Sequence, residues 1–180
     1  MKDCETYLIT GGSRSGKSRY ALELAKFAEK PFYIATAAAG DDEMTDRIKK
    51  HQNERGERWE TIEEEINLAD AIESAKFAGA DCIVVDCLTL WTSNIMFNDT
   101  VNLDNELEKV LNSIATASTT LIFVTNEVGS GIVPANKLSR EFRDSAGIVN
   151  QKIAAAVKNV VLTVSGIPVH IKPQPGKSQI

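Results

Sequence analysis

Residues 11–18 read Gly-Gly-Ser-Arg-Ser-Gly-Lys-Ser, which has the spacing G-x-x-x-x-G-K-[ST] of a phosphate-binding loop. Gly11 and Gly16 can adopt backbone angles that a Cβ atom would forbid, so the loop can curl and turn its N–H groups towards an anion. At this spacing Lys17 reaches the β- and γ-phosphates of a nucleotide, and the hydroxyl of Ser18 reaches Mg²⁺. The predicted nucleotide-binding residues of the loop are Gly11, Gly12, Ser13, Arg14, Ser15, Gly16, Lys17 and Ser18.

The segments on either side favour phosphate binding over the alternative, an ordinary glycine-rich turn. Residues 7–10 form a short apolar run typical of a buried strand, and residues 19–27 have a helical pattern. A helix that starts at the loop points its positive dipole end at the bound anion. The order strand, loop, helix is the context that a phosphate-binding loop requires.

Further along the chain, apolar runs alternate with helical patterns. Strands separated by helices indicate an α/β fold with a mainly parallel sheet, and with the phosphate loop they predict a RecA-like, three-layer P-loop fold. Residues 169–171 follow a tight turn at Gly166 and are expected to pair back as an antiparallel edge strand. We expect one domain over residues 1–172 and a mobile tail over residues 173–180. The expected strands are 32–36, 82–86, 120–124 and 160–164, and the expected helices are 41–55, 68–78, 103–117 and 135–158.

Composition narrows the class of protein. The chain has 180 residues, of which 43% are hydrophobic and 25% charged, as in an ordinary globular protein. A net charge of −5 argues against nucleic-acid binding. There is no apolar run long enough to span a membrane and no signal-peptide pattern at the start. Three cysteines without metal-ligand spacing are expected to be reduced thiols, so we expect a cytoplasmic protein.

Two polar residues outside the loop are candidates for the chemistry. Asp86 ends the run 82–86, at the edge where open parallel sheets bind ligands, and could hold Mg²⁺ opposite Ser18. His51 lies on the charged helix expected at 41–55, which could cover the nucleotide as a lid and place an imidazole for attack on phosphorus. The alternatives are a solvated carboxylate at the end of a strand and a half-buried histidine on a helix face.

A second group of candidates follows the strand expected at 120–124. Two glycines and a proline give residues 125–134 a defined loop shape, so Asn126 and Glu127 are candidates for substrate contacts. Arg140 and Arg143 lie about one turn apart on the next helix and could meet a second phosphate. A plain connecting loop and solvated arginines are the alternatives.

Taken together, these motifs resemble the bifunctional adenosylcobinamide kinase/adenosylcobinamide-phosphate guanylyltransferase family of cobalamin biosynthesis. The resemblance runs in order along nearly the whole chain. The matching stretches are Thr-Gly-Gly-Ser-Arg-Ser-Gly-Lys-Ser at 10–18, Tyr-Ile-Ala-Thr at 33–36, Asp-Asp-Glu-Met at 41–44 with Arg47, Ile48 and His51, Asp-Cys-Leu-Thr at 86–89 with Asn94, Thr-Asn-Glu-Val-Gly at 125–129, Gly-Ile-Val-Pro at 131–134, Phe-Arg-Asp at 142–144 with Gly147, Val-Asn-Gln at 149–151, and Val-Ser-Gly at 164–166.

The resemblance implies two reactions. A nucleoside triphosphate, ATP or GTP, phosphorylates the aminopropanol hydroxyl of adenosylcobinamide. GMP is then transferred from GTP to adenosylcobinamide phosphate, through a guanylylated histidine that aligns with His51, and pyrophosphate is released. Lys17 and Mg²⁺ would stabilise charge in both steps. The resemblance also implies a homotrimer. The residues that it places around the guanine nucleotide are Thr36, Ala37, Gln52, Asn53, Glu54, Arg55, Glu63 and Asp86.

Two other functions stay open at this point. The chain could be a P-loop kinase for another small alcohol, with His51 purely structural. It could also be a RecA-like regulatory ATPase that binds a partner.

Overall fold

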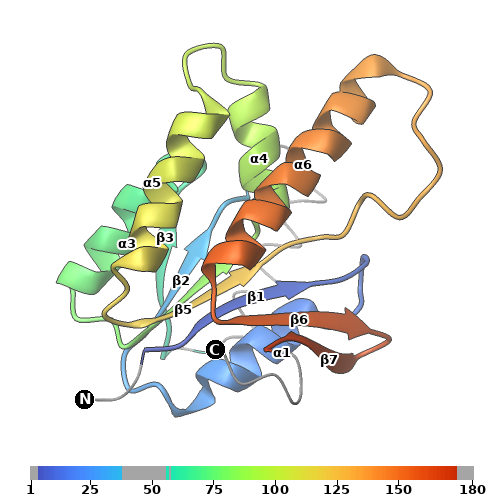
Figure 1. Ribbon diagram of the computed structural model, residues 1–180. Coiled ribbons are helices and arrows are strands. Elements are labelled where there is room, and N and C mark those ends of the chain that lie inside the picture. Colours follow the sequence, from blue (N-terminus) through green and yellow to red (C-terminus); the bar gives the residue numbers. More distant parts are fainter. Residues whose placement is uncertain (1–3, 38–55, 57, 174–180) are drawn as a thin grey trace.

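A computed structural model describes residues 4–37, 56 and 58–173 of the chain (Figure 1). Its seven-stranded sheet has the order β3-β2-β4-β5-β1-β6-β7. The first six strands in this order are parallel, and β7 pairs antiparallel with β6, which confirms the expected edge strand. The strands are β1 (Thr6–Thr10), β2 (Pro31–Ala35), β3 (Glu60–Glu63), β4 (Cys82–Asp86), β5 (Thr120–Val124), β6 (Asn159–Val164) and β7 (Ile167–Lys172).

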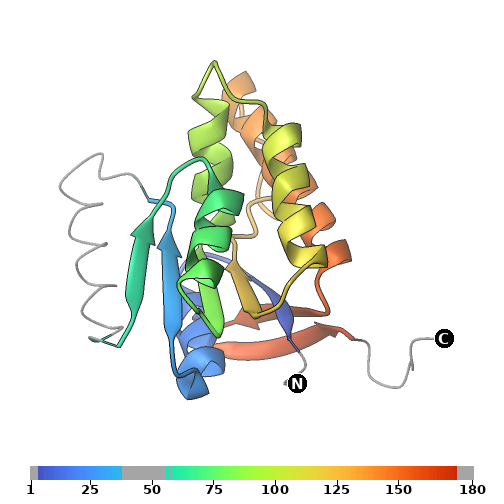
Figure 2. The ribbon, with the colours of Figure 1, turned by 90° about the vertical axis from the view of Figure 1, so that its left-hand side faces the viewer.

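Helices cover both faces of the sheet (Figures 1 and 2). Alternate residues of β4 show the two layers, because Ile83 and Val85 pack against α3 to α6 while Cys82 and Val84 pack towards α1. This confirms the three-layer α/β fold. None of the helices in the described part of the chain is long and apolar enough to cross a membrane. The helices are α1 (Lys17–Leu24), continued by a short 3₁₀ turn η1 (Ala25–Phe27), α3 (Leu68–Phe77), α4 (Leu88–Met96), α5 (Leu103–Ala115) and α6 (Lys137–Ala156).

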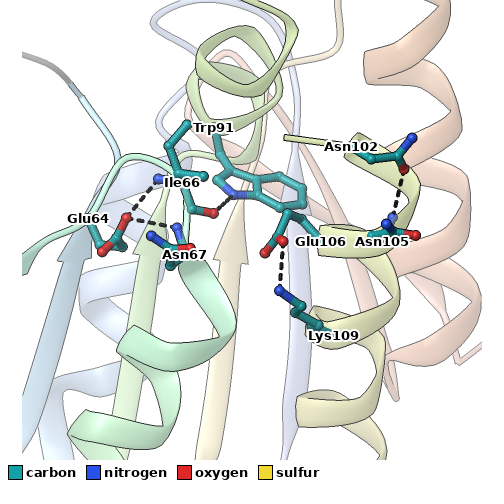
Figure 3. A network of polar contacts seen from close by, with 8 residues as sticks. All are labelled: Glu64, Ile66, Asn67, Trp91, Asn102, Asn105, Glu106 and Lys109. Carbon is teal, nitrogen blue, oxygen red and sulfur yellow. Dashed lines mark hydrogen bonds and ion pairs between the residues drawn. The ribbon is translucent and has the colours of Figure 1, made fainter. Parts of the chain in front are cut away.

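The larger core includes Trp91 of α4, whose side chain is fully buried. Its indole N–H donates to the carbonyl of Ile66 at 2.8 Å, so the ring is packed without leaving its polar atom unpaired (Figure 3). Glu64 accepts from the N–H groups of Ile66 and Asn67 at 2.8 and 2.7 Å and fixes the turn that starts α3. These bonds hold the connection from β3 to α3 against α4.

Two elements of the fold are not expected from the sequence. Strand β3 reads Glu-Thr-Ile-Glu and lies at the edge of the sheet, where only Ile62 faces the core, so it lacks a strand-like apolar run. Helix α4 reads Leu-Thr-Leu-Trp-Thr-Ser-Asn-Ile-Met and is buried on most sides, so it has no clear polar face. The helix expected at 41–55 and the tail at 174–180 lie outside the described residues.

Candidate functional site

The phosphate-binding loop leaves β1 in the middle of the sheet, between β5 and β6. Gly11 and Gly16 have φ angles of 148° and 98°, in the region that favours glycine. A Cβ atom on Gly11 would lie 2.5 Å from the carbonyl oxygen of Thr163, and one on Gly16 would lie 3.2 Å from Cα of Gly166. Both positions therefore require glycine, as the motif predicted. The β6–β7 hairpin approaches both glycines closely, which is a second reason for glycine that the sequence does not show.

Lys17 begins α1 with its side chain buried in the loop. Its ammonium group donates to the carbonyl of Gly12 at 2.7 Å. Burial lowers the pKa of Lys17, while the nearby carboxylate of Asp86 acts in the opposite direction. The ammonium group therefore lies against the backbone of the loop, on a flexible stem that can turn its three donors to a phosphate.

Ser18, Asp86 and Tyr33 meet beside this lysine. The hydroxyl of Ser18 donates to Oδ2 of Asp86 at 2.8 Å, and the hydroxyl of Tyr33 donates to the same oxygen at 2.7 Å. Mg²⁺ is usually held by one or two carboxylates together with substrate phosphates and water, and the Ser18–Asp86 pair fits that requirement. In the part of the chain that the structure describes, no three His, Cys, Asp or Glu side chains form a metal cluster.

Thr36 is fully buried at the end of β2. Its hydroxyl donates to the carbonyl of Cys87 and accepts from the N–H of the same residue, both at 2.8 Å. Asn94 of α4 donates to the carbonyls of Thr36 and Glu65, at 2.8 and 3.2 Å. The hydroxyl of Thr36 is thus engaged with the end of β4, and the predicted nucleotide-binding role of Thr36 stays a prediction.

The other predicted nucleotide-binding residues on this side lie close to the same edge. Glu63 and Asp86 both pair in register with Ala35, so the two carboxylates stand in one row across β3, β2 and β4. Ala37, two residues beyond β2, is half-buried. His51 lies outside the described residues. The predicted neighbours that also lie outside them are Gln52, Asn53, Glu54 and Arg55.

The segment after β5 adjoins the phosphate loop through its backbone. The N–H of Glu127 donates to the carbonyl of Gly11 at 3.0 Å, and the N–H of Asn126 donates to the hydroxyl of Thr89 at 2.7 Å. Of the two candidate arginines, Arg140 donates to the carbonyls of Pro134 and Ala135 at 3.1 and 2.6 Å. Arg143 forms a 3.6 Å ion pair with Asp144. Asn126 and Glu127 therefore lie beside the phosphate loop, while a phosphate contact by either arginine stays a prediction.

The residues that support the phosphate loop from β6 and the β6–β7 turn were not predicted from the sequence. The hydroxyls of Ser15 and Thr163 are 2.7 Å apart, and the N–H of Gly166 donates to the carbonyl of Ser15 at 2.9 Å. Tyr33, which holds Asp86, was also missed. Segments 33–36 and 164–166 are part of the family resemblance, but nothing in the local pattern indicates which partners they have.

The model of the protein family described as "Cobinamide kinase / cobinamide phosphate guanyltransferase" matches residues 7–171. The bifunctional adenosylcobalamin biosynthesis protein CobP of Pseudomonas aeruginosa is 45% identical over 172 residues, which cover 93% of this chain and 98% of that protein. The bifunctional adenosylcobalamin biosynthesis protein CobU of Salmonella typhimurium is 42% identical over 179 residues, covering 92% of this chain and 98% of that protein.

Among solved structures, a prototypical ATPase from the type III secretion system of pathogenic bacteria superposes with a TM-score of 0.54 at 8% sequence identity. The match covers 88% of this chain and 50% of the ATPase chain. At this identity the likeness concerns the fold alone, and it agrees with the RecA-like P-loop architecture expected from the sequence.

The family match and the two relatives span almost the whole chain, including the phosphate loop and the segment after β5. They decide against a kinase for an unrelated alcohol and against a regulatory ATPase. The chain belongs to the cobinamide kinase / cobinamide phosphate guanyltransferase family and is a bifunctional kinase and guanylyltransferase.

Proposed function

We propose that one phosphate cradle, formed by the loop 11–18 and Asp86, serves both reactions of this enzyme in adenosylcobalamin biosynthesis. The main support for the proposal is the 2.8 Å hydrogen bond from the hydroxyl of Ser18 to Oδ2 of Asp86, beside the buried side chain of Lys17. A hydroxyl, a carboxylate and a lysine at the start of a helix are the groups that phosphoryl transfer in P-loop enzymes requires. The described residues bring these three groups together beside the phosphate loop.

In the kinase step, the aminopropanol hydroxyl of adenosylcobinamide attacks the γ-phosphorus of ATP or GTP. A new O–P bond forms, the bond from the γ-phosphorus to the β–γ bridging oxygen breaks, and the nucleoside diphosphate leaves. The hydroxyl gives up its proton to solvent water. Lys17 and the N–H groups of the loop stabilise the negative charge that collects on the departing diphosphate.

In the second step, a neutral nitrogen of His51 attacks the α-phosphorus of GTP, and an N–P bond forms as pyrophosphate leaves. A phosphate oxygen of adenosylcobinamide phosphate then attacks the same phosphorus. The N–P bond breaks, the histidine is regenerated, and adenosylcobinamide-GDP is the product. The support for His51 is its place in the sequence and in the family resemblance.

Ser18 and Asp86 are the residues that would hold Mg²⁺. When bound, the ion would act as a Lewis acid on the phosphate oxygens. Tyr33 keeps the carboxylate of Asp86 turned towards Ser18. The Mg²⁺ requirement is therefore expected to be common to the two reactions.

The assembly is also part of the proposal. The family resemblance implies a homotrimer, and strand β7 supports a subunit contact because Ile167, Val169 and Ile171 are exposed along it. Sedimentation velocity of the purified protein tests this directly. A single species with the mass of one chain would contradict it.

The test of the histidine mechanism is incubation with GTP labelled at the α-phosphate. We expect a label on the protein that is stable to base and labile to acid, as a phosphoramidate is, and that His51→Ala abolishes. His170→Ala is the matched control, because His170 is the other of the two histidines and lies exposed on β7. A label that persists in His51→Ala and disappears in His170→Ala would refute the assignment.

A further inference from the structure

We infer that the β5–α6 loop, residues 125–136, carries the surface on which the corrin macrocycle of the cobinamide substrate rests. Ile132 and Val133 at its tip are the residues that contact the ring. The inference rests on the proposed function, because it concerns how the same cradle is presented with its acceptor. It assigns the part of the site that must hold the bulk of a large substrate.

Both ends of the loop are held firmly. At the start, the hydroxyl of Thr125 donates to Asn150 at 2.8 Å, and the amide of Asn150 donates back to the carbonyl of Asn126 at 3.3 Å. At the end, Asn136 accepts from the N–H of Ser139 at 2.7 Å and caps α6, while Arg140 donates to two loop carbonyls. Hydrogen bonds with Asn136 and with side chains of α6 therefore fix both ends of the loop.

The tip exposes apolar side chains. Ile132 is 98% exposed and Val133 is 60% exposed, and Leu138 at the start of α6 is 49% exposed. Exposure alone does not indicate a ligand, since single apolar residues are common on protein surfaces and Phe77 on α3 is 97% exposed. Ile132 and Val133 are adjacent in the sequence and Leu138 follows five residues later, whereas Phe77 is a single exposed apolar residue at the end of α3.

The position of the loop distinguishes it further. It leaves the cradle directly, because the N–H of Glu127 donates to the carbonyl of Gly11 at 3.0 Å. Figure 1 shows the chain swinging outward from the end of β5 before it returns to α6. The reacting hydroxyl must come within about 3–3.5 Å of the phosphorus, so the rest of the substrate has to lie against surfaces that border the cradle. The loop is such a surface.

The charge of the loop fits the same occupant. Residues 128–136 read Val-Gly-Ser-Gly-Ile-Val-Pro-Ala-Asn and contain no charged side chain, so Glu127 is the one charged residue in the loop 125–136. The edge of a corrin ring carries methyl groups and neutral amide side chains. Branched apolar side chains can pack against the methyl groups, and the exposed backbone of a glycine-rich loop can hydrogen-bond the amides.

The test uses the double variant Ile132→Ser/Val133→Ser of the full chain. We expect the KM for adenosylcobinamide in the kinase reaction to rise at least tenfold, with kcat within about threefold and the KM for the triphosphate unchanged, because the substrate loses apolar contact with two side chains while the nucleotide site is unaltered. Ile132→Leu should keep a near-normal KM. Phe77→Ser, at matched exposure but on α3, should leave all parameters unchanged.

Labelling by α-labelled GTP in the absence of corrinoid separates this inference from the proposed function. A wild-type protein that takes up no label refutes the histidine mechanism and leaves the KM comparison valid. A folded double variant with an unchanged KM for adenosylcobinamide overturns the inference. So does a double variant that sediments with a smaller mass and loses kcat at unchanged KM, because the tip would then be a contact between copies of the chain.

Discussion

Tyr33 donates a 2.7 Å hydrogen bond to Oδ2 of Asp86, the oxygen that also accepts from Ser18. Tyr33 comes from β2 and Asp86 from β4, so two neighbouring strands together hold the carboxylate that faces the phosphate loop. With Oδ2 occupied by two donors, the other carboxylate oxygen is oriented as well. The position of the carboxylate thus depends on the sheet as well as on the loop.

Tyr33→Phe should weaken the use of Mg²⁺ without unfolding the protein. A hydrogen bond to a charged group is worth about 1.5–3 kcal/mol, so we expect the Mg²⁺ concentration at half-saturation to rise about tenfold. It should rise equally in the two reactions and in a fluorescence titration of nucleotide binding. Tyr20→Phe is the control, since that hydroxyl lies 3.5 Å from His170 on the hairpin side of α1. An unchanged Mg²⁺ requirement in Tyr33→Phe would show that Tyr33 does not position the site.

Lys17→Ala should lower both reactions together. Removing one preorganised charge-stabilising donor typically costs a factor of about 10²–10³ in rate. Initial rates of cobinamide phosphorylation and of protein labelling by α-labelled GTP would both be measured, with a thermal melt to show that the variant is folded. If labelling persisted at the wild-type rate while phosphorylation was lost, the idea of one shared cradle would be wrong.

Thr163→Val should weaken triphosphate binding from a position that touches no phosphate. The variant loses the 2.7 Å contact with Ser15 and the 3.2 Å bond to the carbonyl of Thr10. We expect the free energy of unfolding to fall by about 1–2 kcal/mol and the affinity for triphosphate to fall several-fold, because the loop loses a buried support. Denaturant unfolding and nucleotide titration measure the two effects. The control is Thr61→Val on the exposed edge strand β3, which should change neither the free energy of unfolding nor the affinity for triphosphate. A Thr163→Val protein with normal affinity for triphosphate would show that the hairpin is not needed to shape the loop.

The buried thiols predict how stability changes at high pH. Burial raises the pKa of Cys82 and of Cys87 to about 12, from an ordinary value of 9.0. Above pH 9 the unfolded chain releases these protons while the folded chain keeps them, so the free energy of unfolding should fall by about 1.4 kcal/mol per pH unit for each thiol. Urea unfolding between pH 8 and 10.5 would show the decline.

Cys82→Ser and Cys87→Ser should each make that decline less steep, because a serine hydroxyl does not titrate in this range. Comparing each variant with the wild type cancels the titration of other groups, such as Tyr7 and Tyr20, whose pKa values burial also raises. Identical slopes in the wild type and both variants would mean that the thiols do not govern the decline.

Much of the fold could be predicted from local patterns. The strand expected at 120–124 agrees with β5, and the strand expected at 82–86 agrees with β4. Two elements were missed. Each owes its regular structure to contacts with neighbouring elements and has no clear pattern of its own in the sequence. Glu60–Glu63 is a strand because it can pair with β2, and Leu88–Met96 is a helix that lies between other elements rather than at the surface.

The sequence by itself determined the phosphate loop, because that motif is local: eight consecutive residues set its backbone angles, its lysine and its hydroxyl. It also determined that Asp86 lies at the carboxyl edge of the sheet, because the apolar run 82–86 predicts a strand that ends there. Only the tertiary structure decided which residues support these groups. Tyr33 lies 53 residues from Asp86 and Ser15 lies 148 residues from Thr163, so no local pattern connects them. The pairing of β2 with β4 and of β1 with β6 brings each pair within hydrogen-bonding distance.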